Sequence, residues 1–563
     1  MPRSAYLIAC LLSILSGCAV KTSAPQSAAP ANKADDIAAT SPIYPLLLAE
    51  FAVQRDQPDL AYRQYQLLAE KYRTPELAEQ ASYLAQYLGN AEDLSKSAQL
   101  WHDISPDSRV ASNLLLDSLF QTKQYAEVFS TLNKFDWRSN NAMYSLLLGR
   151  VEQLDQGDIE AFAQALRPQL QQHPRNPFYH LSTALIARHQ LRWQGAEDEV
   201  NEALHLAPSL QQAIVLKADL LFRQRKFTET TRFLSQANKA HPSPQLQDML
   251  ARAYLADNKA KKALPVLQSL IKEQPDNLEA RFTLGRTQIQ LARYKDAQNS
   301  FLELWDMAPN RSPVAFYLGY LAELQKDQDS AIDYYQQVTR GDELITAQSR
   351  LIVLLSGNGQ DDQIPAMLKQ ARKNNPDQAA QLLELEAEWQ SKKLDYAAAR
   401  QAYDEALKLD PNNPQLLYNR AMLGDKDGNL EAMIADLEAL VALEPDNAQI
   451  LNALGYTLTD RTTRHNEALQ LLLKAHTLQP DDPAILDSLG WVYYNLQRYD
   501  EAEDYLTKAY GAFPDPEVAY HYGAALWQQS KPDQALRIWR KALRSKPDYS
   551  PIRDIMEQYG VQP

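Results

Sequence analysis

A proline recurs at nearly equal steps through most of this 563-residue chain, and this period limits the possible folds more than any other feature. Successive prolines lie 33, 34 or 35 residues apart, except for one interval of 67 residues, which is two steps long. They are Pro174, Pro208, Pro242, Pro275, Pro309, Pro376, Pro411, Pro445, Pro480, Pro514 and Pro547. A period near 34 residues is typical of helical hairpins that stack on one another. Strand-like runs of alternating β-branched residues are almost absent, so we expect an all-α solenoid.

One unit of the period has the residue spacing of two packed helices. In residues 483–514 the apolar positions of the two predicted helices are Leu486, Leu489, Gly490 and Tyr493, followed by Ala502, Leu506 and Ala509. The small residues Gly490 and Ala502 let the two helices approach closely, and Pro514 ends the second helix. This pattern resembles the tetratricopeptide repeat (TPR), which implies helix–turn–helix pairs stacked into a right-handed superhelix.

The units differ in regularity along the chain. Residues 175–547 hold the regular TPR array, and residues 42–174 keep the spacing in a more degenerate form. Some fifteen helix pairs fit between these limits, and residues 548–563 are expected to form a capping helix and a tail. Each unit exposes an apolar face until a neighbour covers it, so the motif residues are interpreted as packing residues.

The N-terminal segment predicts where the protein is located. Residues 1–17 combine Arg3 with an apolar stretch and then small residues, as in a secretory signal peptide. The sequence LSGC that ends at Cys18 resembles the lipobox of bacterial lipoproteins, which implies cleavage before Cys18 and its lipidation. By the same resemblance, Ala19 favours the outer membrane, with the protein facing the periplasm. Residues 18–41 are rich in Ala, Pro and Ser and predict a tether. The alternative is an ordinary signal peptide with an accidental cysteine.

Composition and motifs argue against an enzyme and against a nucleic-acid binder. The formal net charge is −14, and no basic run is present that could neutralise phosphates. The only cysteines are Cys10 and Cys18, and the nine histidines include no HExxH pattern. GxSxG, GxxxxGK[ST] and GxGxxG motifs are absent as well. We therefore expect no catalytic residues, no cofactor, no metal site and no small-molecule substrate, and a function in binding.

Binding is expected on the concave surface, which is formed largely by the first helix of each pair. In TPR proteins a few positions of that helix tend to face this groove. In this sequence they carry aromatic and amide residues that the helix pair itself does not need for packing, which suggests partner contacts. These candidates are Phe316, Tyr320, Tyr418, Met422, Asn452, Tyr456, Trp491, Tyr494, Asn495, Tyr520 and Trp527. The alternative is that the rings pack between neighbouring repeats.

Two stretches carry a narrower resemblance. Residues 44–89, which begin YPLLLAEFAVQRDQPDLAYRQYQ, and residues 451–510, which begin LNALGYTLTDRTTRHNEALQLLL, are similar to the LbcA family of outer-membrane TPR lipoproteins. Members of this family bind a carboxyl-terminal processing protease in pseudomonads. The resemblance in plan covers nearly the whole chain: lipobox, tether, degenerate early pairs and regular later pairs.

This resemblance implies a non-enzymatic adaptor. Such a protein would recruit and activate a PDZ-containing serine protease and present protein substrates to it, among them peptidoglycan cross-link hydrolases. A second class remains open, namely a scaffold of an envelope assembly or of a polysaccharide-export complex. Genetic neighbourhood separates the two classes, because a gene within a polysaccharide operon would favour the scaffold.

Overall fold

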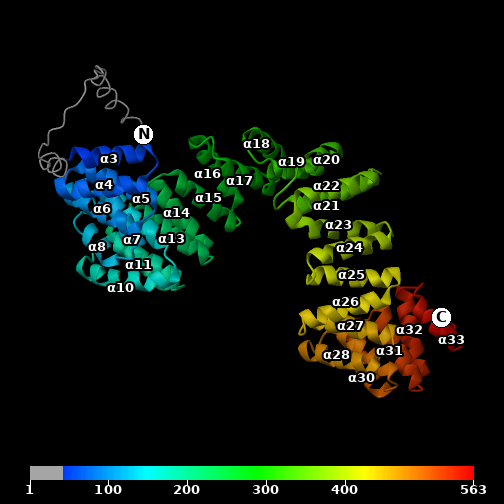
Figure 1. Ribbon diagram of the computed structural model, residues 1–563. Helices are drawn as coiled ribbons and strands as arrows, with labels where there is room; N and C mark the ends of the chain where they lie inside the picture. Colours follow the sequence, from blue (N-terminus) through cyan, green and yellow to red (C-terminus); the bar gives the residue numbers. More distant parts are fainter. Residues whose placement is uncertain (1–41, 563) are drawn as a thin grey trace, which may run out of the picture. The chain divides into compact units, whose positions relative to one another are not determined.

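The computed structural model describes residues 42–562, and thirty-one α-helices follow one another within that range (Figure 1). No strand occurs among these described residues. The all-α solenoid predicted from the proline period is therefore confirmed. Cys18, the predicted signal peptide and the predicted tether lie outside the described residues.

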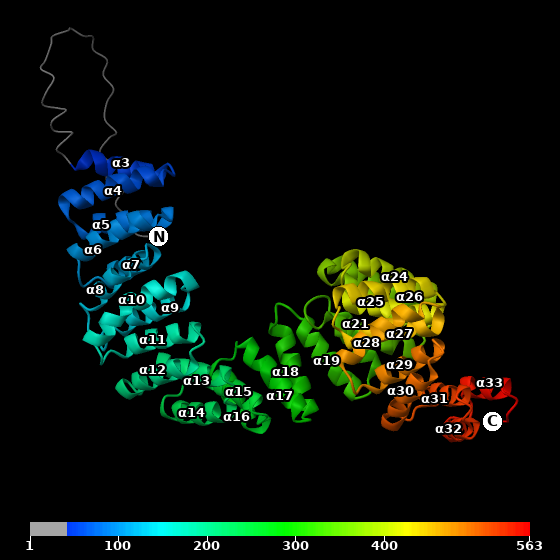
Figure 2. The same ribbon diagram turned by 90° about the horizontal axis from the view of Figure 1, so that it is seen from below.

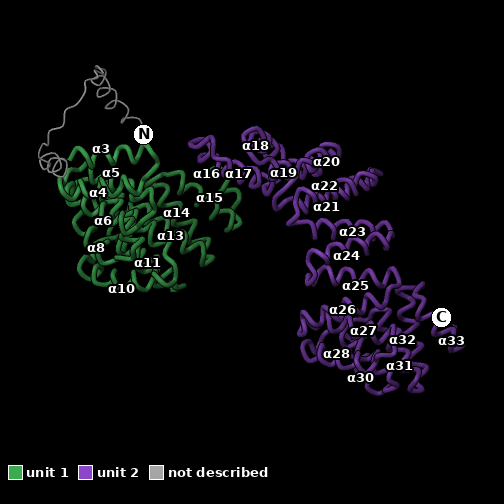
Figure 3. Tube along the Cα trace, in the orientation of Figure 1, with its two compact units in different colours: residues 1–266 green, residues 267–563 purple. Residues whose placement is uncertain are grey.

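The chain divides into two compact units, residues 1–266 and residues 267–563, with the boundary inside helix α16 (Figure 3). In the first unit the helices from α3 to α14 lie over one another as successive layers (Figure 2). Its helices are α3 (Ile43–Gln54), α4 (Pro58–Tyr72), α5 (Pro75–Leu88), α6 (Ala91–Ile104), α7 (Arg109–Gln121), α8 (Tyr125–Leu132), α9 (Asn141–Glu152), α10 (Gln156–Gln172), α11 (Pro177–His189), α12 (Trp193–Leu206), α13 (Gln211–Arg223), α14 (Phe227–Ala240), α15 (Pro244–Ala256) and the first part of α16 (Ala260–Glu273).

The second unit contains the remaining helices and two short 3₁₀ turns. They are α17 (Leu278–Gln290), α18 (Tyr294–Met307), α19 (Ser312–Leu324), α20 (Gln328–Gln336), α21 (Leu344–Gly357), η1 (Asp361–Gln363), α22 (Ile364–Asn374), η2 (Pro376–Gln378), α23 (Ala379–Lys392), α24 (Tyr396–Leu409), α25 (Pro414–Asp427), α26 (Leu430–Leu443), α27 (Ala448–Arg461), α28 (His465–Leu478), α29 (Pro483–Asn495), α30 (Tyr499–Ala512), α31 (Pro516–Gln528), α32 (Pro532–Ser545) and α33 (Ser550–Gln558).

The recurring proline has the same structural position in every unit that carries it: it comes two residues after the second helix of a pair. Helix α30, for example, ends at Ala512, and Pro514 follows. Proline disfavours the helical conformation of the residue before it, so the helix ends there. The long 67-residue interval contains two pairs, α19/α20 and α21/α22. Helix α20 is nine residues long and has no proline after it.

A glycine on the first helix of several pairs allows the second helix to approach closely. A Cβ atom placed on Gly455 would lie 2.6 Å from Leu472 Cγ, and one on Gly285 would lie 2.6 Å from Phe301 Cζ. Both facing side chains are fully buried. The glycine in the repeat pattern is thus a packing residue, because any larger side chain would overlap the opposite helix.

Helices α7, α8, α10 and α11 of the first unit are held together by aromatic rings instead of by this glycine contact. Phe162 is fully buried and packs on Phe129, with ring centroids 5.4 Å apart. Phe129 in turn packs on Tyr179 at 5.5 Å, and the Tyr179 hydroxyl donates a hydrogen bond to Asn133 Oδ1. Large rings fill the same space with a different sequence, which is why the repeat signal fades in residues 42–174.

Candidate partner-binding grooves

A cavity of about 590 Å³ opens on the first helices of the pairs at the C-terminal end of the second unit. Residues of α25, α26, α27 and α31 line it, together with Tyr549 and Pro551 at the start of α33. Tyr456 on α27 and Glu517 on α31 are 61 residues apart in sequence, yet the Tyr456 hydroxyl donates a hydrogen bond of 2.5 Å to Glu517 Oε1. The superhelix therefore brings α31 next to α27 across this cavity.

Three stacked rings form one wall of this region. Trp491 lies between Tyr494, at a centroid distance of 4.8 Å, and His521, at 4.1 Å, and both pairs of rings are nearly parallel. His521 Nδ1 is 3.0 Å from both carboxylate oxygens of Asp487, which is also buried. Because a carboxylate only accepts hydrogen bonds, His521 Nδ1 carries a proton.

The charged residues of the cavity are partly paired. Arg461 is 2.7 Å from an Asp425 oxygen and 3.0 Å from an Asp460 oxygen. Burial, with the nearby Glu517 carboxylate as the next cause, raises the pKa of Tyr549 to about 12. Burial followed by the charge of Asp460 also raises the pKa of Tyr520. Burial is thus the larger cause of both shifts, and the neighbouring carboxylates add to it.

The structure brings four of the predicted contact residues to this region, namely Met422, Tyr456, Trp491 and Tyr520. Tyr494 and Asn495 lie beside them on α29, where Tyr494 covers Trp491 and Asn495 Nδ2 donates to the Trp491 carbonyl oxygen.

The other predicted residues lie elsewhere. Trp527 stacks on Tyr559 after α33, at 4.5 Å. Phe316 packs against Tyr335 at 5.9 Å across the α19/α20 pair. The remaining three are half-buried or exposed on their helices: Tyr320, Asn452 and Tyr418.

Sequence reasoning missed two polar residues that line the C-terminal cavity, Glu517 and His521, and Asp487, which contacts His521 from behind. The recognised groove positions held only aromatic, amide and methionine side chains, and carboxylates are common throughout the chain. One signal was available, because Asp487 and His521 are 34 residues apart, one full repeat. Residues separated by one repeat lie next to each other on adjacent first helices.

The Asp487–His521 pair has the form of a catalytic acid–histidine pair but lacks the third member. A nucleophile would have to lie within hydrogen-bonding distance of the histidine. Within residues 42–562 no serine or threonine hydroxyl bonds to His521, and Thr457, which lines the cavity, donates to the Ala453 carbonyl oxygen instead. The arrangement of these side chains therefore suits binding.

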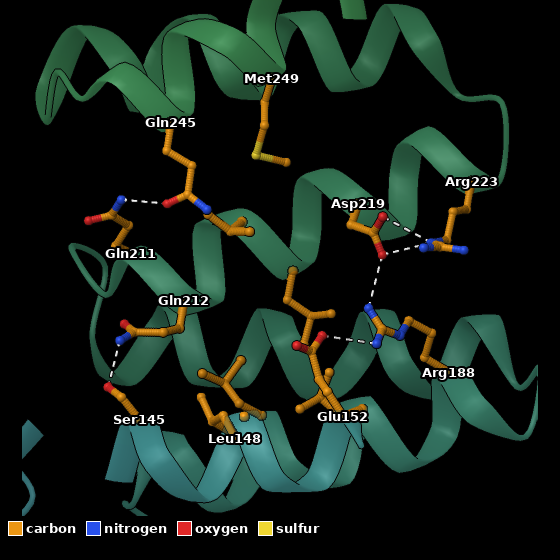
Figure 4. Close-up of a pocket in the computed structure, with 15 residues that line it drawn as sticks. Ser145, Leu148, Glu152, Arg188, Gln211, Gln212, Asp219, Arg223, Gln245 and Met249 are labelled. Carbon is orange, nitrogen blue, oxygen red and sulfur yellow. Dashed lines mark hydrogen bonds and ion pairs between the residues drawn. The ribbon is translucent and has the colours of Figure 1, made fainter. Parts of the chain in front are cut away.

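A second groove, with a volume of about 720 Å³, lies in the first unit on α9, α11, α13 and α15 (Figure 4). Its floor is apolar and is formed by leucines, Val215 and Met249. On one side Gln212 donates a hydrogen bond to Ser145 Oγ, and Gln211 donates one to Gln245 Oε1 (Figure 4). Amide side chains both donate and accept hydrogen bonds, so they suit a polypeptide backbone.

Four charged side chains form a continuous chain on the other side of this first-unit groove. Arg188 bridges Glu152, at 3.0 Å, and Asp219, at 3.1 Å, and Asp219 also accepts from Arg223 at 2.8 Å (Figure 4). Gly149 lies in the wall of the groove, and a Cβ atom placed on it would meet nothing within 4 Å. The groove is thus open at this point, and its charged side chains balance one another.

Comparison with known proteins agrees with this geometry. The sequence pattern of the tetratricopeptide repeat matches residues 254–318, 314–340, 366–414, 392–435 and 417–561. A TPR repeat-containing protein of Pseudomonas aeruginosa, PA4667, is 34% identical over 515 residues, which cover 85% of this chain and 82% of that protein. The chain belongs to the tetratricopeptide repeat family. Solenoids of this family bind peptides and proteins, which is the function class that the two grooves suit.

More distant similarities share the repeat. The human protein O-mannosyl-transferase TMTC3 is 26% identical over 328 residues, which are 57% of this TPR chain and 34% of that protein. Among solved structures, MamA is 21% identical and covers 33% of the chain with a TM-score of 0.27. YrrB, described as a TPR protein with an unusual peptide-binding site, is 17% identical and covers 35% with a TM-score of 0.30. Each of these two matches spans 98% of the solved structure.

No helix in residues 42–562 is long and apolar enough to cross a membrane. The same range contains no cluster of three or more His, Cys, Asp or Glu side chains that could hold a metal ion.

Proposed function

We propose that this TPR protein is a non-enzymatic adaptor, lipid-anchored at the outer membrane through Cys18 and facing the periplasm. It binds and activates a carboxyl-terminal processing serine protease and presents protein substrates, such as peptidoglycan cross-link hydrolases, to that protease. The resemblance of residues 44–89 and 451–510 to the LbcA family supports this choice of partner.

The observation that carries the proposal is the presence of two separate grooves of different chemistry, one in each compact unit. The first-unit groove has an apolar floor and amide side chains, which suit an extended polypeptide segment. The C-terminal cavity is lined by tyrosines and carboxylates. A protein with two such surfaces can hold protease and substrate at once, which raises the effective concentration of each near the other.

A scaffold role in an envelope assembly or in polysaccharide export is the second candidate. The same grooves would serve it, because groove geometry does not by itself name a partner. The match to the transferase TMTC3 covers only 34% of that protein. A transferase activity is therefore not proposed for this chain.

A direct experiment combines the purified full-length protein with a periplasmic PDZ serine protease and a peptidoglycan cross-link hydrolase. The expected result is a stable complex with the protease and faster proteolysis of the hydrolase. A preparation that neither binds such a protease nor accelerates proteolysis would exclude the adaptor function.

A pair of matched variants tests the first-unit groove within the same assay. Gly149→Phe places a ring in the open space of the groove, whereas Gly195→Phe adds the same ring on α12, where a Cβ atom also meets nothing and no groove residue lies. We expect Gly149→Phe to slow substrate proteolysis and Gly195→Phe to leave it unchanged. Equal rates for both variants would remove this groove from the mechanism.

A further inference from the structure

We infer that the C-terminal cavity receives a cationic side chain, arginine or lysine, from a partner protein. This inference rests on the proposed binding function and deepens it, because it names the chemistry of one contact. Three features of the cavity carry it: a carboxylate without a cation, a buried imidazole with a free acceptor atom, and walls of aromatic rings.

Glu517 supplies the carboxylate. It accepts a hydrogen bond from the Tyr456 hydroxyl, but no lysine, arginine or histidine of residues 42–562 forms an ion pair with it. The two other carboxylates of the cavity, Asp425 and Asp460, both pair with Arg461. Glu517 is therefore the acidic group of the cavity that still has room for a cationic donor.

The acceptor atom is Nε2 of His521. This side chain is only 1% exposed, and its ring lines the cavity. Nδ1 is occupied by Asp487, whereas Nε2 has no hydrogen-bond partner among the described residues. In the neutral tautomer that donates from Nδ1, Nε2 presents a lone pair, which matches a ligand that donates a hydrogen bond.

The rings of Tyr456, Tyr520 and Tyr549 form the walls. Aromatic faces carry negative charge density and attract cations, more strongly where water is excluded. Burial is the main cause of the raised pKa values of Tyr549 and Tyr520, and nearby carboxylates contribute to both shifts.

The net charge of the cavity points to the same occupant. Its three carboxylates, Asp425, Asp460 and Glu517, face two permanent cations, Arg461 and Lys426, which leaves one negative charge. An anionic side chain would meet like charges here, and an apolar side chain would leave Glu517 without a cation.

The test uses the full-length protein labelled with 5-fluorotryptophan and followed by ¹⁹F NMR. Trp491 stacks on His521, so its signal, assigned by its loss in Trp491→Phe, reports on the cavity. The probes are N-acetyl-arginine amide and its neutral isostere N-acetyl-citrulline amide. We expect a saturable shift of the Trp491 signal with the arginine probe and no shift with the citrulline probe.

Glu517→Gln should lower the affinity for the arginine probe by about tenfold or more, since it removes a charge-assisted hydrogen bond. The glutamine can still accept from Tyr456, so the fold is retained. Asp533→Asn removes one acidic charge from the first turn of α32, outside the cavity, and should leave the affinity unchanged.

Equal responses to the two probes, or an unchanged affinity in Glu517→Gln, would overturn the inference. Protease binding is measured with the same proteins, which separates the two proposals. If the arginine probe binds as expected but no protease does, the adaptor function fails and the cavity assignment stands. If the protease binds equally well to Glu517→Gln and the arginine probe gives no response, the cavity assignment fails and the function stands.

Discussion

Gly490 on α29 lies so close to Leu506 on α30 that even a methyl group at position 490 would overlap the leucine side chain. Leu506 is fully buried, so it cannot move into solvent to make room. We expect Gly490→Ala to lower the free energy of unfolding by about 1–3 kcal/mol, the usual cost of overpacking a core. Thermal and urea unfolding, followed by circular dichroism, measure this change.

Gly511, in the last turn of α30, provides the control. A Cβ atom there meets nothing within 4 Å, and alanine is the better helix former. Gly511→Ala is therefore expected to leave the stability unchanged or to raise it by about 0.5–1 kcal/mol. Similar losses in the two variants would show that overpacking of the α29/α30 contact is not the cause.

The lipid anchor is tested at Cys18, which lies outside the described residues. Several acyl chains, each burying many CH₂ groups at about 0.8 kcal/mol per group, hold a protein on a bilayer almost permanently. Cys18→Ser removes the acylation site, so the protein should appear in the soluble fraction after cell breakage. Continued sedimentation with outer-membrane vesicles would contradict the lipoprotein prediction.

Replacing Tyr456 and Trp491 together by alanine should weaken partner binding, as the groove assignment from the sequence requires. The structure adds a cost in stability, because Trp491 is 7% exposed and lies between two rings. Truncating a buried tryptophan typically costs about 3–5 kcal/mol. The double variant therefore confounds binding with folding.

Tyr456→Ala alone separates the two effects, because it leaves the ring stack intact. We expect weaker binding of the partner with little change in the unfolding midpoint. Tyr294→Ala is the control, since Tyr294 is 38% exposed and does not line the cavity. The assignment fails if both variants bind the partner as tightly as the unaltered protein.

The fold could be predicted from the sequence because its determinants are local and repeated. The most regular repeats have a glycine, a facing large side chain and a closing proline at fixed offsets, and Gly490, Leu506 and Pro514 show all three. The residues of the binding site were harder to predict from the sequence. Aromatic residues at groove positions have the same appearance whether they face a ligand or a neighbouring ring, and Tyr456 and Trp527 illustrate the two outcomes.

The polar residues of the site are brought together by contacts between different repeats, and the sequence of a single repeat does not encode those contacts. Tyr456 meets Glu517 across 61 residues, nearly two repeats, and only the curvature of the solenoid brings them together. Curvature follows from small rotations at every interface between pairs. Those rotations depend on side-chain shapes that the repeat pattern does not specify, so the cavity could not be predicted.

His180 on α11 gives the first unit a stability that depends on pH. Burial alone would lower the pKa of this histidine, but hydrogen bonds to Glu199 Oε2 at 2.7 Å and to the Pro174 carbonyl oxygen at 2.9 Å raise it above its ordinary value. Both ring nitrogens face acceptors, so the folded protein favours the protonated imidazole.

A raised pKa in the folded state has a definite sign in the unfolding equilibrium. The contribution of His180 is fully present below the unfolded pKa of about 6.5. It is lost as the pH rises from there through the higher folded pKa, because the folded state then gives up a proton that stabilised it. His102 acts in the opposite sense, since burial lowers its pKa. The effect of His180 must therefore be isolated by mutation.

The thermal unfolding midpoint of the full-length protein, measured from pH 5.5 to 8.5, provides the readout. His180→Gln should lower the midpoint at pH 5.5 and have a smaller effect at pH 8.5, because glutamine replaces the neutral imidazole better than the charged one. His205→Gln, at a side chain 81% exposed in the same unit, should shift the midpoint little at any pH. If His180→Gln lowers the midpoint equally at both ends of the range, the ring is held by packing, and its protonation does not contribute to stability.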